Sequence, residues 1–94
     1  MAAVVGSSNA SAVLYNDGQR YSTLHNHTNG CVRVYLHGRY YDVRPWQNQQ
    51  FDVAEPGGGL AWAQVSVFKL STCGGRAEKT MWFDGTRWDW DVWR

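Results

Sequence analysis

The chain has 94 residues, a net charge of +1 at pH 7 and 15% aromatic residues. This length predicts a single domain over residues 1–94, with residues 1–10 expected to form a flexible N-terminus. The aromatic content argues against a disordered chain. The near-neutral charge argues against a dedicated nucleic-acid binder, which needs a basic surface, and no apolar run is long enough to span a bilayer.

Short runs with strand character alternate with turn signals along the whole chain, and no stretch has helical periodicity. The expected strands, in chain order, are Ala12–Tyr15, Arg20–His27, Cys31–Leu36, Arg39–Arg44, Gln49–Val53, Leu60–Leu70, Glu78–Phe83 and Thr86–Trp93. Regular short spacing of this kind is typical of an all-β sandwich or barrel. We expect an antiparallel β-sandwich of two packed sheets, with about seven or eight strands and a Trp-rich hairpin at the end.

Two Xaa-Gly pairs in the first half of the chain predict hairpins. A two-residue turn at His37-Gly38 gives a register with one mostly apolar face and one face of aromatic and oppositely charged pairs. The pairs are Leu36 with Arg39, Val34 with Tyr41, Val32 with Val43, Tyr35 with Tyr40 and Arg33 with Asp42. At Asn29-Gly30, a three-residue loop with Gly30 in the left-handed conformation is favoured, because it sets Leu24 opposite Val34.

The last fourteen residues, MWFDGTRWDWDVWR, hold four of the six tryptophans. Asp84-Gly85 predicts a two-residue hairpin turn. The pairs would be Phe83 with Thr86, Trp82 with Arg87 and Met81 with Trp88. This register assigns a core face to Met81, Phe83, Trp88, Trp90 and Val92. The exposed face then holds Trp82, stacked under Arg87, together with Asp89, Asp91 and Trp93.

The longest expected strand, Leu60–Leu70, has two different faces. Ala61, Ala63, Val65 and Val67 form an apolar face that is expected in the core. Trp62, Gln64, Ser66, Phe68 and Leu70 form the other face. That second face interleaves aromatic and amide groups, as carbohydrate-binding surfaces and protein interfaces do, and core packing on both faces is the alternative.

Cys31 and Cys73 are the only cysteines. One disulfide in an oxidising compartment is expected, with two independent buried thiols as the alternative, and we therefore expect an extracellular protein. The stretch 1–11 has neither the basic start nor the apolar core of a signal peptide. It fits a mature N-terminus after an added Met, or the start of an intracellular protein. Asn9–Ser11 and Asn26–Thr28 both match the glycosylation sequon.

No catalytic motif is present, and we expect a protein that is not an enzyme and needs no metal or cofactor. His25 and His27 share a strand face and could bind a metal together with His37, but a polar outer face is the favoured interpretation. Asp89 and Asp91 also share a face. Paired carboxylates can serve glycoside hydrolysis, whereas their position beside Arg87 favours a charged surface.

Several short features resemble the tendamistat-like α-amylase inhibitors that Streptomyces secretes. They are Leu14-Tyr15, Arg20-Tyr21-Ser22, Asn29-Gly30-Cys31, the Tyr-x-Val-x-Pro-x-Gln stretch at 41–47, and Cys73. The resemblance covers residues 11–73 and implies a small disulfide-bonded β-sandwich. In that family a Trp-Arg-Tyr turn enters the amylase active site. The resemblance assigns this role to Arg20 and Tyr21, with Gln19 in the place of the Trp.

The chain departs from that family in its cysteines. The family has two disulfides, whereas here Ser11 and Tyr40 or Tyr41 stand at two of the four cysteine positions. Cys31 and Cys73 would therefore pair with each other or remain free. The Trp-rich last twenty residues have no counterpart in the family.

These observations lead to three hypotheses for function. The first is a secreted protein that binds a protein target, such as a glycoside hydrolase that it inhibits, through Gln19, Arg20 and Tyr21. The second is a carbohydrate-binding module or small lectin. Its sugar-stacking residues would be Trp46, Trp62, Trp82 and Trp93, with Asp89, Asp91 and Gln64 bonding hydroxyls. The third is a self-assembling structural domain whose strand edges pair between copies. The oligomeric state stays open.

Overall fold

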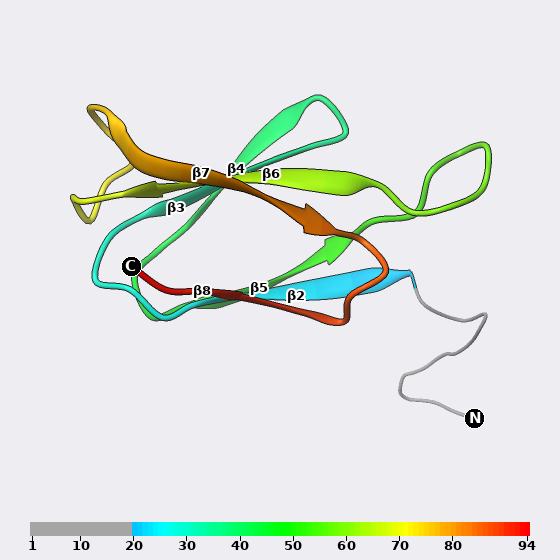
Figure 1. The fold of residues 1–94 in the computed structure, drawn as a ribbon, viewed down its shortest axis with the longest axis horizontal. Coiled ribbons are helices and arrows are strands. Elements are labelled where there is room, and N and C mark those ends of the chain that lie inside the picture. Colours follow the sequence, from blue (N-terminus) through cyan, green and yellow to red (C-terminus); the bar gives the residue numbers. More distant parts are fainter. Residues whose placement is uncertain (1–19) are drawn as a thin grey trace.

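The computed structural model describes residues 20–94, which form an all-β sandwich. The strands are β2 (Tyr21–Asn26), β3 (Val32–Leu36), β4 (Arg39–Val43), β5 (Asn48–Asp52), β6 (Trp62–Phe68), β7 (Ala77–Asp84) and β8 (Asp89–Val92). One sheet has the order β5-β2-β8 and the other the order β4-β3-β6-β7, and the two form separate layers (Figure 1). No helix in the described range is long and apolar enough to cross a membrane.

Some predictions fall on residues that lie outside the described range. They concern the strand Ala12–Tyr15, the N-terminal residues 1–10, the sequon at Asn9–Ser11 and the contact residue Gln19.

The core between the sheets is built from the alternate residues of each strand that face inward. Its buried members are Leu24, Val32, Val34, Leu36, Val43, Phe51, Val53, Ala63, Val65, Val67, Trp90 and Val92. Trp90 joins the two layers, because its ring stacks on Phe51 of one sheet and Phe83 of the other, with centroid distances of 6.2 and 5.8 Å. Its indole N–H donates to the Asp84 carbonyl at 3.0 Å, so its one polar group is satisfied.

The β3–β4 hairpin confirms the predicted register at all five pairs, from Val32 with Val43 to Leu36 with Arg39. Both turn residues have a positive φ, 54° at His37 and 76° at Gly38. That combination is the signature of a type I′ turn, whose twist matches that of the flanking strands.

The predicted hairpin at Asn29-Gly30 is wrong. β2 pairs with β5 and β8, whereas β3 pairs with β4 and β6, so the chain crosses here from one sheet to the other. Leu24 and Val34 both lie in the core, one from each layer. Gly30 does not have a positive φ. Glycine is required there for another reason: a Cβ would collide with the carbonyl oxygen of Phe68.

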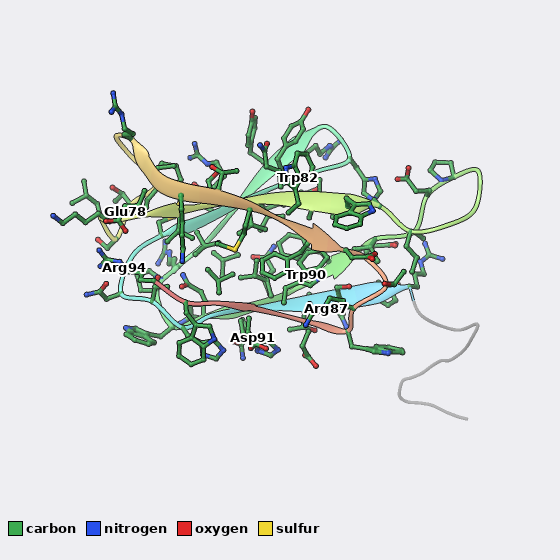
Figure 2. The ribbon with its side chains drawn as sticks, viewed as in Figure 1. Glu78, Trp82, Arg87, Trp90, Asp91 and Arg94 are labelled. Carbon is green, nitrogen blue, oxygen red and sulfur yellow. A yellow bond between two sulfur atoms is a disulfide. The ribbon has the colours of Figure 1, made fainter. Side chains whose placement is uncertain are left out.

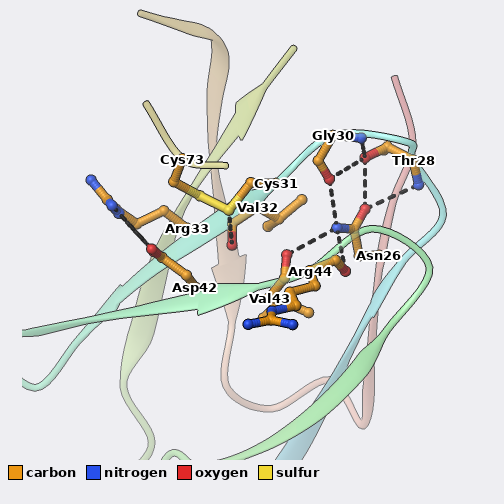
Figure 3. Close-up of a disulfide and its surroundings, with 10 residues drawn as sticks. All are labelled: Asn26, Thr28, Gly30, Cys31, Val32, Arg33, Asp42, Val43, Arg44 and Cys73. Atoms are coloured by element: carbon orange, nitrogen blue, oxygen red, sulfur yellow. Dashed lines mark hydrogen bonds and ion pairs between the residues drawn. A yellow bond between two sulfur atoms is a disulfide. The ribbon is translucent and has the colours of Figure 1, made fainter. Parts of the chain in front are cut away.

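Asn26 anchors this crossing with its buried side-chain amide (Figure 3). Its Nδ2 donates to the carbonyl oxygens of Gly30, Val43 and Arg44 at 2.9–3.1 Å. Its Oδ1 accepts from the backbone N–H and the hydroxyl of Thr28 at 3.0 and 2.7 Å. Because this nitrogen is buried and hydrogen-bonded, the folded chain does not present the Asn26–Thr28 sequon for glycosylation.

The predicted disulfide is confirmed. Cys31, immediately before β3, is bonded to Cys73 in the β6–β7 connection, across 42 residues of sequence (Figure 3). The bond ties two segments of the four-stranded sheet to each other.

The predicted C-terminal hairpin is also wrong. β7 pairs with β6, and β8 runs parallel to β2 in the opposite sheet, so the expected pairs of Phe83, Trp82 and Met81 with Thr86, Arg87 and Trp88 do not form. Gly85 has no positive φ, as a type I′ turn would need, and a Cβ there would collide with the Ala61 carbonyl. The stretch is therefore a second sheet-to-sheet crossing.

Burial along the C-terminal stretch follows from that crossing. Trp90 and Val92 are buried, as predicted, and Trp82 and Trp93 are exposed, as predicted. Trp88 was predicted in the core and is instead 60% exposed, because it precedes β8 and has no partner on β7.

The alternation predicted for the long strand is confirmed over β6. Ala63, Val65 and Val67 are fully buried, while Trp62 on the other face is exposed. Phe68 is buried but lies outside the core cluster, and the guanidinium of Arg33 lies 5.6 Å from the centre of its ring.

Candidate functional site

An aromatic row crosses the outer face of the four-stranded sheet. It consists of Tyr40, Tyr35, Gln64 and Trp82, which are direct cross-strand neighbours on β4, β3, β6 and β7. The three aromatic members are 69%, 38% and 59% exposed. Neighbouring strands are about 4.8 Å apart, so the row spans roughly 14 Å. Trp62, also exposed, lies two residues before Gln64 on the same face and widens the row.

The strand register holds this row in place. Tyr35 and Tyr40 pack with ring centroids 4.7 Å apart and an interplanar angle of 43°. Beside them, Arg33 forms two hydrogen bonds with Asp42, at 2.7 and 3.1 Å, and its guanidinium lies 5.8 Å from the Tyr40 ring. These bonds lower the pKa of Asp42 and raise that of Arg33, so the pair is ionised at neutral pH. The exposed rings therefore need little ordering before a ligand binds.

The tryptophans predicted to bind carbohydrate do not form one site. Trp62 and Trp82 lie on the outer face of the four-stranded sheet, whereas Trp93 follows β8 in the three-stranded sheet. Trp46 lies in the β4–β5 connection with a φ of 63° and is 65% exposed. Figure 2 shows Trp82 on the outer side of one layer, Asp91 on the outer side of the other, and Trp90 between them.

The outer face of the three-stranded sheet carries two imidazole–carboxylate pairs. Nε2 of His25 lies 2.8 Å from Oδ1 of Asp89, and Nε2 of His27 lies 2.8 Å from Oδ1 of Asp91. The hydrogen bond to Asp89 raises the pKa of His25. The imidazole of His27 also stacks on the Trp93 indole, with centroids 4.0 Å apart and an angle of 12°. His25 and His27 share a face, as predicted.

His37 does not join this face. Its Nε2 lies 3.0 Å from the carbonyl oxygen of Asp52 and its Nδ1 3.3 Å from Glu55. Among residues 20–94, the group of three side chains close enough to share a metal is Cys31, Asp42 and Cys73. Its two sulfurs are bonded to each other, and a disulfide sulfur is not the thiolate that binds metals.

Arg20 and Tyr21 are the predicted contact residues for a protein target. Arg20 immediately precedes β2, Tyr21 is its first residue, and both are exposed. Nε and Nη2 of Arg20 donate to Oδ2 of Asp52 at 3.0 and 2.9 Å. The guanidinium lies 5.8 Å from the centre of the Tyr21 ring. Asp52 thus holds the Arg20 side chain, whose guanidinium lies beside the Tyr21 ring.

Tyr35 and Tyr40 are the members of the row that sequence reasoning did not assign to a binding site. Their pairing with each other was predicted, but their alignment with Gln64 and Trp82 depends on β6 lying between β3 and β7. Comparison of the chain with protein-family models, curated proteins and solved structures found no match.

Proposed function

We propose that this chain is a non-catalytic carbohydrate-binding protein and that its ligand lies along the aromatic row. The observation that carries the proposal is the alignment of exposed rings from three strands, with the Gln64 amide between them. Sugar rings have apolar C–H faces that pack on aromatic rings, and hydroxyl groups that bond to amides. An exposed aromatic patch of this kind typically marks an interaction site.

The shape of the row favours a single polysaccharide chain over a flat crystalline surface. The Tyr35 and Tyr40 rings are tilted by 43° to each other, and strands in a sheet are twisted relative to their neighbours. The members of the row are uncharged, and the charges of Arg33 and Asp42 beside it compensate each other, so a neutral polymer suits the row. The Cys31–Cys73 disulfide is typical of proteins in oxidising compartments, and we include an extracellular location in the proposal.

Native gel electrophoresis with polysaccharide in the gel tests this proposal. Hydroxyethyl cellulose, xylan and soluble starch would each be used in turn. We expect at least one polymer to retard the protein. Trp82→Ala should lower the apparent affinity measured from this retardation about tenfold, because a stacking ring contributes about 0.5–1.5 kcal/mol beyond its buried area.

The matched control is Trp46→Ala, which removes a similarly exposed indole outside the row and should leave the retardation unchanged. Absence of retardation by every polymer would reject the proposal. Equal losses of retardation in Trp46→Ala and Trp82→Ala would show that the aromatic row is not the binding site.

A second candidate is a protein-target binder, such as an inhibitor of a glycoside hydrolase, supported by the ordered Arg20–Tyr21 pair. Arg and Tyr are common anchors of protein interfaces, and prior ordering lowers the entropy cost of binding. Inhibition of α-amylase tests this idea. The hypothesis requires that the unmodified chain inhibits the enzyme and that Arg20→Ala or Tyr21→Ala weakens this inhibition at least tenfold. Unchanged inhibition in both variants would show that Arg20 and Tyr21 are not the contact residues.

A further inference from the structure

We propose a second carbohydrate site on the outer face of the three-stranded sheet, centred on Trp93, which makes the chain bivalent. This proposal rests on the proposed function, because it assigns the same class of ligand to the opposite face of the sandwich. It concerns a different set of residues, so the two can fail separately.

The Trp93 indole is held as a flat platform. His27 stacks on one of its faces at 4.0 Å and 12°, and the indole is nevertheless 60% exposed. The imidazole is itself fixed, because its Nε2 is 2.8 Å from Asp91 on the neighbouring strand. A ring supported from one side presents its other side to a ligand with little loss of side-chain freedom.

Carboxylates beside the platform can bind hydroxyl groups. Asp89 and Asp91 are both exposed, and each is bonded to one imidazole nitrogen. An ionised carboxylate has about four lone-pair positions, so each of these retains acceptor capacity. A sugar hydroxyl can therefore donate to either carboxylate without displacing its histidine.

An amide extends this polar surface across the sheet. Asn48 on β5, His25 on β2 and Asp91 on β8 are cross-strand neighbours. An amide donates as well as accepts, which complements the acceptor-only carboxylates. The combination of one supported indole with neighbouring acceptors and donors matches a sugar ring with its hydroxyl groups.

The two sites face away from each other, since their strands belong to different layers (Figure 2). One polysaccharide chain bound at the aromatic row and another at Trp93 would be bridged by a single protein molecule. On a polymer with many equivalent segments, two sites per protein increase the apparent affinity beyond that of either site.

The decisive test combines electrophoresis with light scattering, using whichever of hydroxyethyl cellulose, xylan or soluble starch retards the protein most. Trp93→Ala and Trp82→Ala should each weaken retardation about tenfold, and the double variant should abolish it. The unmodified protein should raise the light scattering of a dilute solution of the polymer. Each single variant should bind without that increase, and Trp46→Ala should behave as the unmodified protein.

Asp89→Ala keeps the Trp93–His27 stack and provides an independent variant of the same site, also expected to weaken retardation. If both Trp93→Ala and Asp89→Ala bind normally while Trp82→Ala loses all binding, the second site is rejected and the proposed function stands. If Trp82→Ala binds normally while Trp93→Ala does not, the aromatic row is rejected and so is bivalency. If no polymer binds, both proposals fail.

Discussion

The two outer faces of the sandwich differ in how their exposed side chains are held. On the four-stranded sheet, aromatic rings lie in line across the strands, beside one Arg33–Asp42 pair that is ionised at neutral pH. On the three-stranded sheet, the carboxylates of Asp89 and Asp91 on β8 are bonded to imidazoles, while Asp52 on β5 is paired with Arg20. The two faces therefore differ in one kind of pair: Asp42 is held by a guanidinium, whereas Asp89 is held by the His25 imidazole, whose pKa it raises.

Trp90→Ala should have the largest effect, because it disrupts the support of both faces at once. Trp90 is fully buried and stacks on rings from each sheet. Removing a buried aromatic side chain of this size should lower the free energy of unfolding by about 3–5 kcal/mol. Urea denaturation measures the change. The control is Trp88→Ala, whose exposed indole should contribute less than about 0.5 kcal/mol, and similar losses in both would contradict the assigned core.

Replacing both Cys31 and Cys73 with Ser should lower the free energy of unfolding by about 2–4 kcal/mol, because the disulfide restricts the unfolded chain. The bond lies within the four-stranded sheet, so amide hydrogen exchange should accelerate more in β3 and β6 than in β2. Uniform acceleration in both sheets would show that the two faces do not differ in local stability.

Gly85→Ala tests the crossing that separates β7 from β8. A Cβ at Gly85 would collide with the Ala61 carbonyl, so the backbone must shift, at a cost of about 1–3 kcal/mol. Gly57→Ala is the control, because no atom lies near its Cβ position and its φ is not in the left-handed region; it should be neutral or slightly stabilising. Thermal denaturation compares the two, and equal melting temperatures would contradict the close packing.

The smallest effect is expected from pH, and it should distinguish the two faces. The hydrogen bond to Asp89 raises the pKa of folded His25 above its ordinary 6.5. The resulting stabilisation is fully present below about pH 6.5 and is lost as the pH rises through the folded-state pKa. Because the pair is partly exposed, the difference should stay below about 1 kcal/mol. His25→Gln should therefore cost more stability at about pH 5.5 than at about pH 8.

The matching variant on the other face is Asp42→Asn. Arg33 lowers the pKa of Asp42, so that pair loses its contribution only as the pH falls through this lowered value. Denaturant titrations of Asp42→Asn should give equal losses in the free energy of unfolding at the same two pH values. Two results would contradict the electrostatic difference between the faces. One is a loss of unfolding free energy in Asp42→Asn that changes with pH, and the other is a loss in His25→Gln that does not.

Local patterns in the sequence predicted the strands and the inward-facing residues but not all connections. His37-Gly38, Asn29-Gly30 and Asp84-Gly85 carry the same turn signal, and only the first is a hairpin. The other two glycines allow a close approach of backbone that a Cβ would prevent. The backbone at the end of β6 approaches Gly30, and the backbone just before β6 approaches Gly85. That approach depends on residues distant in sequence, so turn chemistry alone could not identify it.

The same limit applies to the candidate site. Alternation along the strands predicted that Trp82 is exposed, which is confirmed, and it left open the exposure of Trp62, which the structure shows. The row also needs β3 beside β6 and β6 beside β7, and those pairings join segments that are distant in sequence. The hairpin predicted at Asp84-Gly85 places Trp93 on the same face as Trp82, whereas the crossing at Gly85 places them in different layers.

The most direct test of ligand binding at the aromatic row uses the indole N–H signals of the six tryptophans in a ¹H–¹⁵N NMR spectrum. Each signal would be assigned with a Trp→Phe variant and followed during titration with short oligosaccharides of the retarding polymer. We predict that the signals of Trp62 and Trp82 shift with ligand concentration while those of Trp46 and Trp90 stay in place. A titration that shifts Trp46 and leaves Trp62 and Trp82 unmoved would contradict ligand binding at the row.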